Sequence, residues 1–120
     1  MLARSSFAPR KKNSGKADSK LRIPAFLKWL RGRPCRLERH GGCNGSIEAC
    51  HVDYAGGKGM GLKVSDKWTI PMCSEHHRTQ HAWGWRRFEA NFKIDGLEDS
   101  KAYFEAWPGR LNYERTRDGA

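Results

Sequence analysis

The sequence predicts a small α+β domain in which a two-stranded hairpin is followed by a helix, with short helices and a cysteine-containing knuckle around it. Two stretches rich in strand-forming residues, 46–53 and 67–72, are separated by a glycine-rich loop over 54–66. Four of the five histidines and two of the four cysteines lie between residues 50 and 81. This density of soft and borderline ligands indicates a metal-centred domain.

The other elements are short helices and the two chain ends. Pro24 opens an amphipathic helix that ends at Gly32 and Pro34, before the knuckle over 35–45. Beyond the hairpin, the pattern predicts a Ser74-capped helix to about residue 83, a helix with Phe88 and Phe92 that ends near Gly96, and a helix over 99–107. We therefore expect a basic disordered arm over 1–22, one folded domain over 23–109 and a polar, fraying tail over 110–120.

The net charge of +10 is concentrated near the N-terminus. Residues 1–22 contain seven Lys or Arg and one Asp, which contributes +6. A basic arm beside a near-neutral domain is typical of nucleic-acid binding, with Arg10, Lys11 and Lys12 as candidate phosphate contacts; the alternative is a tail that only aids solubility. No apolar run approaches membrane-spanning length, so we expect a cytoplasmic protein with reduced cysteines and no membrane partner.

Helix phase separates the histidines into two groups. His77 and His81 are four residues apart and share one helix face, whereas His76 points back toward Cys73. Cys35, Cys43, Cys73 and His76 would close a tetrahedron around a structural Zn²⁺ with no open position. Cys50 could replace one member and free His76, and the alternative to a metal site is a set of small buried cysteines.

His77 and His81 form the second candidate site, with the Cys50–His51 corner facing them across the hairpin. Fewer protein ligands leave positions for water and phosphate, as catalysis by a metal ion requires. An imidazole that titrates near neutral pH can take a proton from an attacking water, so His51 is the candidate general base. The alternative for a lone strand histidine is a hydrogen-bonded core residue.

These motifs together resemble the HNH, or ββα-metal finger, endonucleases. The matching order is two cysteines, His51-Val52, Gly59-Met60-Gly61, the run from Ile70 to Thr79, and Phe88-Glu89-x-x-Phe92. Within that family the chain is most similar to small phage and prophage proteins of the RecA-dependent nuclease group. The resemblance covers about residues 24–95 and implies that the domain over 23–109 is an HNH-type nuclease domain.

The resemblance also implies roles for single residues. It makes His51 the general base, places His77 at the last-histidine metal position and makes His81 an additional ligand. Cys73 and His76 take the place of the second cysteine pair of a zinc knuckle, and Asp66 stands where the subgroup has an acidic residue. The family's catalytic ion is Mg²⁺ or another divalent metal.

Two departures concern that metal. Cys50 stands where the family usually has Asp or His, and the family's central Asn has no clear counterpart. A thiolate is a poor partner for Mg²⁺, so either the metal is softer or this corner contributes no ligand.

The reaction implied is hydrolysis of DNA phosphodiesters with little sequence specificity, in phage or prophage recombination or DNA processing, with a RecA-type filament as a candidate partner. Arg78 would clamp a phosphate oxygen, and Lys58 and Lys63 would add charge in the glycine-rich loop. The rival interpretations are a non-catalytic zinc-ribbon DNA-binding module and an adaptor that binds a recombinase filament. Neither rival requires His51 to face His77 and His81.

Overall fold

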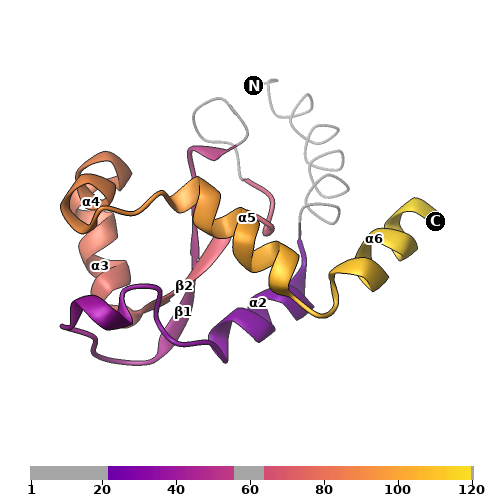
Figure 1. Cartoon of the computed structure of the whole chain (residues 1–120), viewed down its shortest axis with the longest axis horizontal. Coiled ribbons are helices and arrows are strands. Elements are labelled where there is room, and N and C mark those ends of the chain that lie inside the picture. The colour runs from indigo at the N-terminus through magenta and orange to yellow at the C-terminus, as the bar shows by residue number, and fades with distance from the viewer. Residues whose placement is uncertain (1–21, 56–63, 120) are drawn as a thin grey trace, which may run out of the picture.

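A computed structural model describes residues 22–55 and 64–119 and has an α+β architecture. The sheet has two strands, and Figure 1 shows it at the centre with helices packed around it. The elements in order are α2 (Pro24–Arg31), a 3₁₀ turn (Glu38–His40), β1 (Ile47–His51), β2 (Thr69–Cys73), α3 (Ser74–Trp83), α4 (Trp85–Phe92), α5 (Gly96–Ala106) and α6 (Arg110–Gly119). Within the described part of the chain, every helix is too short or too polar to span a lipid bilayer.

The predicted hairpin is confirmed. β1 and β2 pair antiparallel, with Ile47 opposite Cys73 and His51 opposite Thr69. Pro71 is tolerated inside β2 because the sheet has only two strands, so the missing N–H costs no ladder bond on the outer edge. That edge is covered by the segment after α2, where the backbone N–H of Arg36 donates to the carbonyl of Pro71 at 2.8 Å.

Two apolar clusters hold the helices on this hairpin. The larger joins both strands to α4 and the segment after α2, through Leu37, Cys50, Val52, Ile70, Met72, Trp85 and Phe88. The smaller joins α2 to the end of α5, through Ile23, Phe26, Leu30 and Trp107. Full burial of such a side chain stabilises the fold by about 1.5–3 kcal/mol, so ten or so of them position the candidate site residues.

The helices after the hairpin differ from the expected ones at their ends. α4 stops at Phe92, because Lys93 adopts a left-handed conformation with φ of 57°. α5 begins at Gly96 rather than at residue 99, since the Asp95 side chain caps it by accepting a hydrogen bond from the Glu98 N–H at 3.1 Å.

The expected polar tail is also helical. α6 starts at Arg110, and its Tyr113 ring lies 6.1 Å from Phe104 and 6.2 Å from Trp107, measured between ring centroids. An ion pair between Arg110 and Glu114 spans one turn of the helix at 3.1 Å. Packing on two aromatic rings of the α5 end therefore holds a segment whose own composition is polar.

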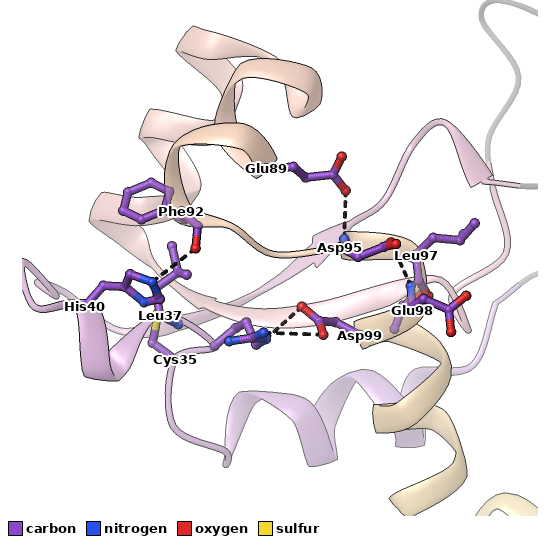
Figure 2. A network of polar contacts seen from close by, with 12 residues as sticks. Cys35, Leu37, His40, Glu89, Phe92, Asp95, Leu97, Glu98 and Asp99 are labelled. Atoms are coloured by element: carbon purple, nitrogen blue, oxygen red, sulfur yellow. Dashed lines mark hydrogen bonds and ion pairs between the residues drawn. The ribbon is translucent and has the colours of Figure 1, made fainter.

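Polar contacts join the knuckle to α4 and α5 (Figure 2). Nε2 of His40 lies 3.1 Å from the carbonyl oxygen of Phe92, and Nε of Arg36 donates to Asp99 at 2.7 Å. His40 thus holds the end of α4 and belongs to neither candidate site. These contacts hold α4 and α5 against the knuckle, so His40 has a structural role.

Gly96 is required by close packing at the start of α5. A Cβ at this position would lie 2.9 Å from a Trp85 ring carbon and 3.1 Å from a Glu89 carboxylate oxygen. We expect Gly96→Ala to lower the free energy of unfolding by about 1–3 kcal/mol, measured by urea denaturation of the metal-loaded chain. Gly32→Ala is the matched control, because its Cβ would meet nothing closer than 3.5 Å, and a change above about 0.5 kcal/mol there would contradict this account.

Candidate functional site

Four predicted ligands come together beside the hairpin. The nearest ligand atoms of Cys35, Cys43, Cys73 and His76 all lie within 4.8 Å of one another. Nδ1 of His76 is 3.6 Å from the Cys35 sulfur, 3.7 Å from the Cys43 sulfur and 3.2 Å from the Cys73 sulfur. Zn–S bonds of about 2.3 Å and Zn–N bonds of about 2.0–2.1 Å at tetrahedral angles imply S···N separations of about 3.5–3.6 Å. The cluster could therefore hold a metal ion such as zinc.

The local structure presents these atoms inward. Cys73 ends β2 and caps α3, and its sulfur accepts the His76 N–H at 3.4 Å; the Leu37 N–H donates likewise to the Cys35 sulfur at 3.3 Å. Desolvation opposes ionisation of Cys73, but the His76 N–H and further hydrogen bonds lower its pKa below the ordinary value. Burial raises the pKa of Cys35, so this thiolate requires a nearby cation.

Cys50 lies outside this cluster. Within residues 22–55 and 64–119, the four residues above are the one group of three or more His, Cys, Asp or Glu side chains close enough to share an ion. The alternative in which Cys50 replaces His76 is therefore wrong. Cys50 is fully buried, its sulfur lies 3.8 Å from the side-chain oxygen of Gln80, and burial raises its pKa to about 12. Cys50 is thus a neutral thiol in the core, and the prediction that it is a ligand of the catalytic metal is corrected.

His77 and His81 meet on one face of α3, as their spacing predicts. Their Nε2 atoms lie 3.2 Å apart, and Nδ1 of His77 lies 2.7 Å from a carboxylate oxygen of Glu48 on β1. The second oxygen of Glu48 accepts from the Ser74 hydroxyl at 2.8 Å. The hydrogen bond with His77 is the main cause that lowers the pKa of Glu48, so an ionised carboxylate holds the His77 ring and leaves its Nε2 facing His81.

His51 contacts a different partner. Its Nε2 lies 2.8 Å from Oδ1 of Asp66, a side chain that is 1% exposed. Side chains alternate along a strand, and both Glu48 and Cys50 contact α3, so His51 projects from the opposite face of β1. Of the predicted Cys50–His51 corner, Cys50 therefore faces α3, where it contacts Gln80 between His77 and His81, whereas His51 contacts Asp66.

The charged candidates have separate positions. Arg78 is 73% exposed at its side chain and pairs with Glu75 at 3.0 Å, one helical turn away. The other basic candidates lie outside the described residues: Arg10, Lys11, Lys12, Lys58 and Lys63. Trp85 is buried in the larger core cluster, and Trp83 packs against it.

A cavity of about 510 Å³ opens beside His81. Asp53 and Tyr54, just beyond β1, line it together with Arg86 of α4. The sequence interpretation passed over Glu48 and this cavity. Glu48 had a usable signal, since it lies two residues before Cys50 and therefore on the same face of β1. No sequence signal predicts the cavity, because it forms only where α3 and α4 meet the end of the hairpin.

Comparison with known proteins identifies a family. Residues 12–96 match the model of the family described as "Protein of unknown function (DUF968)". Neither the curated proteins nor the solved structures gave a match. The matched segment includes both strands, α2, α3, α4 and all four clustered metal ligands. Because it spans well over half of the sequence, the chain belongs to the DUF968 family.

Proposed function

We propose that this protein is a metal-dependent DNA endonuclease of the HNH type, in which β1, β2 and α3 form a ββα-metal finger. One observation carries the proposal: the Nε2 atoms of His77 and His81 converge to 3.2 Å on the helix that follows the hairpin, with Glu48 holding the His77 ring. Two imidazoles as adjacent ligands of one ion have about this separation. In the proposal, Zn²⁺ held by Cys35, Cys43, Cys73 and His76 is structural.

His77 and His81 would hold the catalytic ion. Two nitrogen donors suit a transition dication such as Mn²⁺, Ni²⁺ or Zn²⁺ better than Mg²⁺, which prefers oxygen ligands. When bound, such an ion supplies charge stabilisation for the phosphate and for the departing sugar oxygen. The chain's own contribution is to orient the His77 ring through Glu48.

His51 is the base in this proposal because of the family resemblance, since its contact in the structure is with Asp66 rather than with α3. Its imidazole takes a proton from water, the water oxygen attacks phosphorus, and the P–O bond to the leaving sugar oxygen breaks. A solvent proton then neutralises the departing sugar alkoxide, and His51 returns its proton to solvent. The side chain of His51 is 33% exposed, so water can reach the ring.

Binding would depend on the phosphate backbone rather than on base edges. Arg86 lines the cavity beside His81, Arg78 lies one residue after His77, and the N-terminal arm supplies most of the net charge of +10. We expect low sequence specificity, because contacts to the phosphate backbone carry no sequence information. We place this activity in the cytoplasm, in phage or prophage recombination, with a RecA-type filament as candidate partner.

A second candidate is a non-catalytic zinc-ribbon DNA-binding module or recombinase-filament adaptor. It is favoured by the position of His51, which is engaged by buried Asp66 on the strand face opposite to Glu48 and His77. A histidine with only a structural role would be held in the same way.

Cleavage by wild type and His51→Ala separates the two candidates. We expect zinc-loaded wild type to cut plasmid and single-stranded DNA when Mn²⁺, Ni²⁺ or Mg²⁺ is added. His51→Ala should lose about 10²–10⁴-fold in rate, with zinc content and DNA affinity unchanged, because only the base is removed.

DNA binding by wild type without cutting under any of these metals would contradict the nuclease proposal. Repeating the assay on a recombinase filament then distinguishes a nuclease that requires the filament from a binding module.

A further inference from the structure

We propose that Asp66 is the positioning residue of His51: it holds the ring by Nε2–H and thereby makes Nδ1 the nitrogen that accepts the proton from water. Arg22, where the basic arm joins the domain, completes this arrangement. The inference rests on the proposed function only for the role of His51 as base. The pairing of the side chains themselves is independent of it.

Asp66 is a buried carboxylate with three nitrogen atoms around it. Oδ1 lies 2.8 Å from Nε2 of His51 and 2.9 Å from Nη1 of Arg22, and Oδ2 accepts the backbone N–H of Ile23 at 2.7 Å. A carboxylate this deeply buried, with 1% exposure, is stable only when paired with a charge and hydrogen-bonded. Both oxygens are engaged as acceptors, which identifies Asp66 as the ionised form.

The acceptor character of Asp66 decides the tautomer of His51. A neutral imidazole has one N–H and one lone pair, and its tautomer follows from the hydrogen bond that one nitrogen makes. With Nε2 2.8 Å from an ionised oxygen, the Nε2–H form makes a charge-assisted bond, whereas the other form would place two lone pairs against each other. Nδ1 therefore carries the available lone pair.

The hairpin places these two side chains opposite each other. Thr69 pairs with His51 in the register of the sheet, and its hydroxyl donates to the backbone carbonyl of Asp66 at 2.6 Å. The turn before β2 thus fixes Asp66 relative to the last residue of β1. Arg22 adds a second anchor, since Nη2 donates to the carbonyl of Val64 at 2.7 Å.

The consequence is a link between the arm and the base. Arg22 is the last residue of the arm and Ile23 is the first of the domain, and both donate to the carboxylate that holds His51. A change in the contacts of Arg22 would therefore alter the position of the His51 ring through Asp66 alone. Within residues 22–55 and 64–119, the His51 ring forms no other hydrogen bond or ion pair.

The tautomer of His51 in the wild-type chain is the first test. Nitrogen-15 NMR of the zinc-loaded protein above the titration range of histidine distinguishes Nε2–H from Nδ1–H, with the His51 signals assigned by their loss in His51→Ala. We expect Nε2–H in wild type, and a mixture in Asp66→Asn and in Arg22→Gln. Asp99→Asn is the control, because it removes the carboxylate of another arginine pair and should leave the His51 spectrum unchanged.

A wild-type His51 in the Nδ1–H form would overturn the inference, and this result needs no variant to fold. Cleavage is the second readout: Asp66→Asn should lower kcat by about 10²-fold or more with KM little changed, since substrate binding is untouched. A folded Asp66→Asn that cuts like wild type would also overturn it. If wild type shows Nε2–H but never cuts DNA, the nuclease proposal fails and Asp66 is a structural partner of His51.

Discussion

Cys35→Ala is expected to abolish stoichiometric metal binding and to leave the domain largely unfolded. The sulfur of Cys35 lies 3.6 Å from the His76 nitrogen and joins the segment after α2 to the start of α3. Structural zinc contributes about 10–16 kcal/mol in small finger peptides, whereas a whole domain is stable by only about 5–15 kcal/mol. The free energy lost with one of the four ligands is therefore larger than the stability that the small apolar core can supply.

Cys50→Ala is the matched control for this prediction. Cys50 is as deeply buried as Cys35 but contacts Gln80 and lies outside the ligand cluster. We expect it to retain one metal ion per chain and to lose only about 1–2 kcal/mol from packing. Metal content by elemental analysis and thermal unfolding by circular dichroism provide the comparison. Equal metal content and equal melting temperature in the two variants would contradict the four-residue site.

His77→Ala is expected to reduce the cleavage rate by about 10²–10³-fold while the domain stays folded. His77 contributes one of the two converging Nε2 atoms, and preorganised groups that stabilise developing charge are each worth about 10²–10³-fold. Glu48→Gln should cost less, about 10–100-fold, because Glu48 acts by orienting the His77 ring. The cleavage rate is measured across a titration of Mn²⁺ or Ni²⁺ on zinc-loaded protein.

His40→Ala is the control for the loss of a histidine as such. Its ring contacts the Phe92 carbonyl and belongs to neither histidine cluster, so its cleavage rate should stay within about twofold of wild type. Wild-type rates in folded His77→Ala at every metal concentration would refute the catalytic role of the His77–His81 pair.

The spacing of residues along the chain was sufficient to predict much of the fold. Turn-forming glycines between two strand-like stretches predict the hairpin, and Ser74 with a 3.6-residue period predicts α3. The same period separates His76 from His77 and His81, because positions four apart on a helix are neighbours whatever packs around them. The structure confirms this separation and the four-residue cluster with Cys35, Cys43 and Cys73.

The ends of the later helices were within reach of sequence reasoning only in part. Asp95 followed by Glu98 is a recognisable start signal for α5. α6 offers no such signal, since its residues are polar and its anchor is the contact of Tyr113 with two rings of another segment. Propensity and patterning describe neighbours in the chain, so a helix stabilised mainly by distant packing escapes them.

What the sequence by itself determined is therefore the architecture, the grouping of histidines and the set of clustered ligands. The first two follow from periods of two and 3.6 residues, and the ligand set follows from the cysteines of the knuckle together with the helix phase of His76. What only the tertiary structure decided is which partner each key side chain has. His51 contacts Asp66, Glu48 contacts His77, and Cys50 lies in the core, through pairings 15, 29 and 30 residues apart. The strand's alternation sends His51 and Glu48 to opposite faces, but which element covers each face depends on the packing of all the helices together.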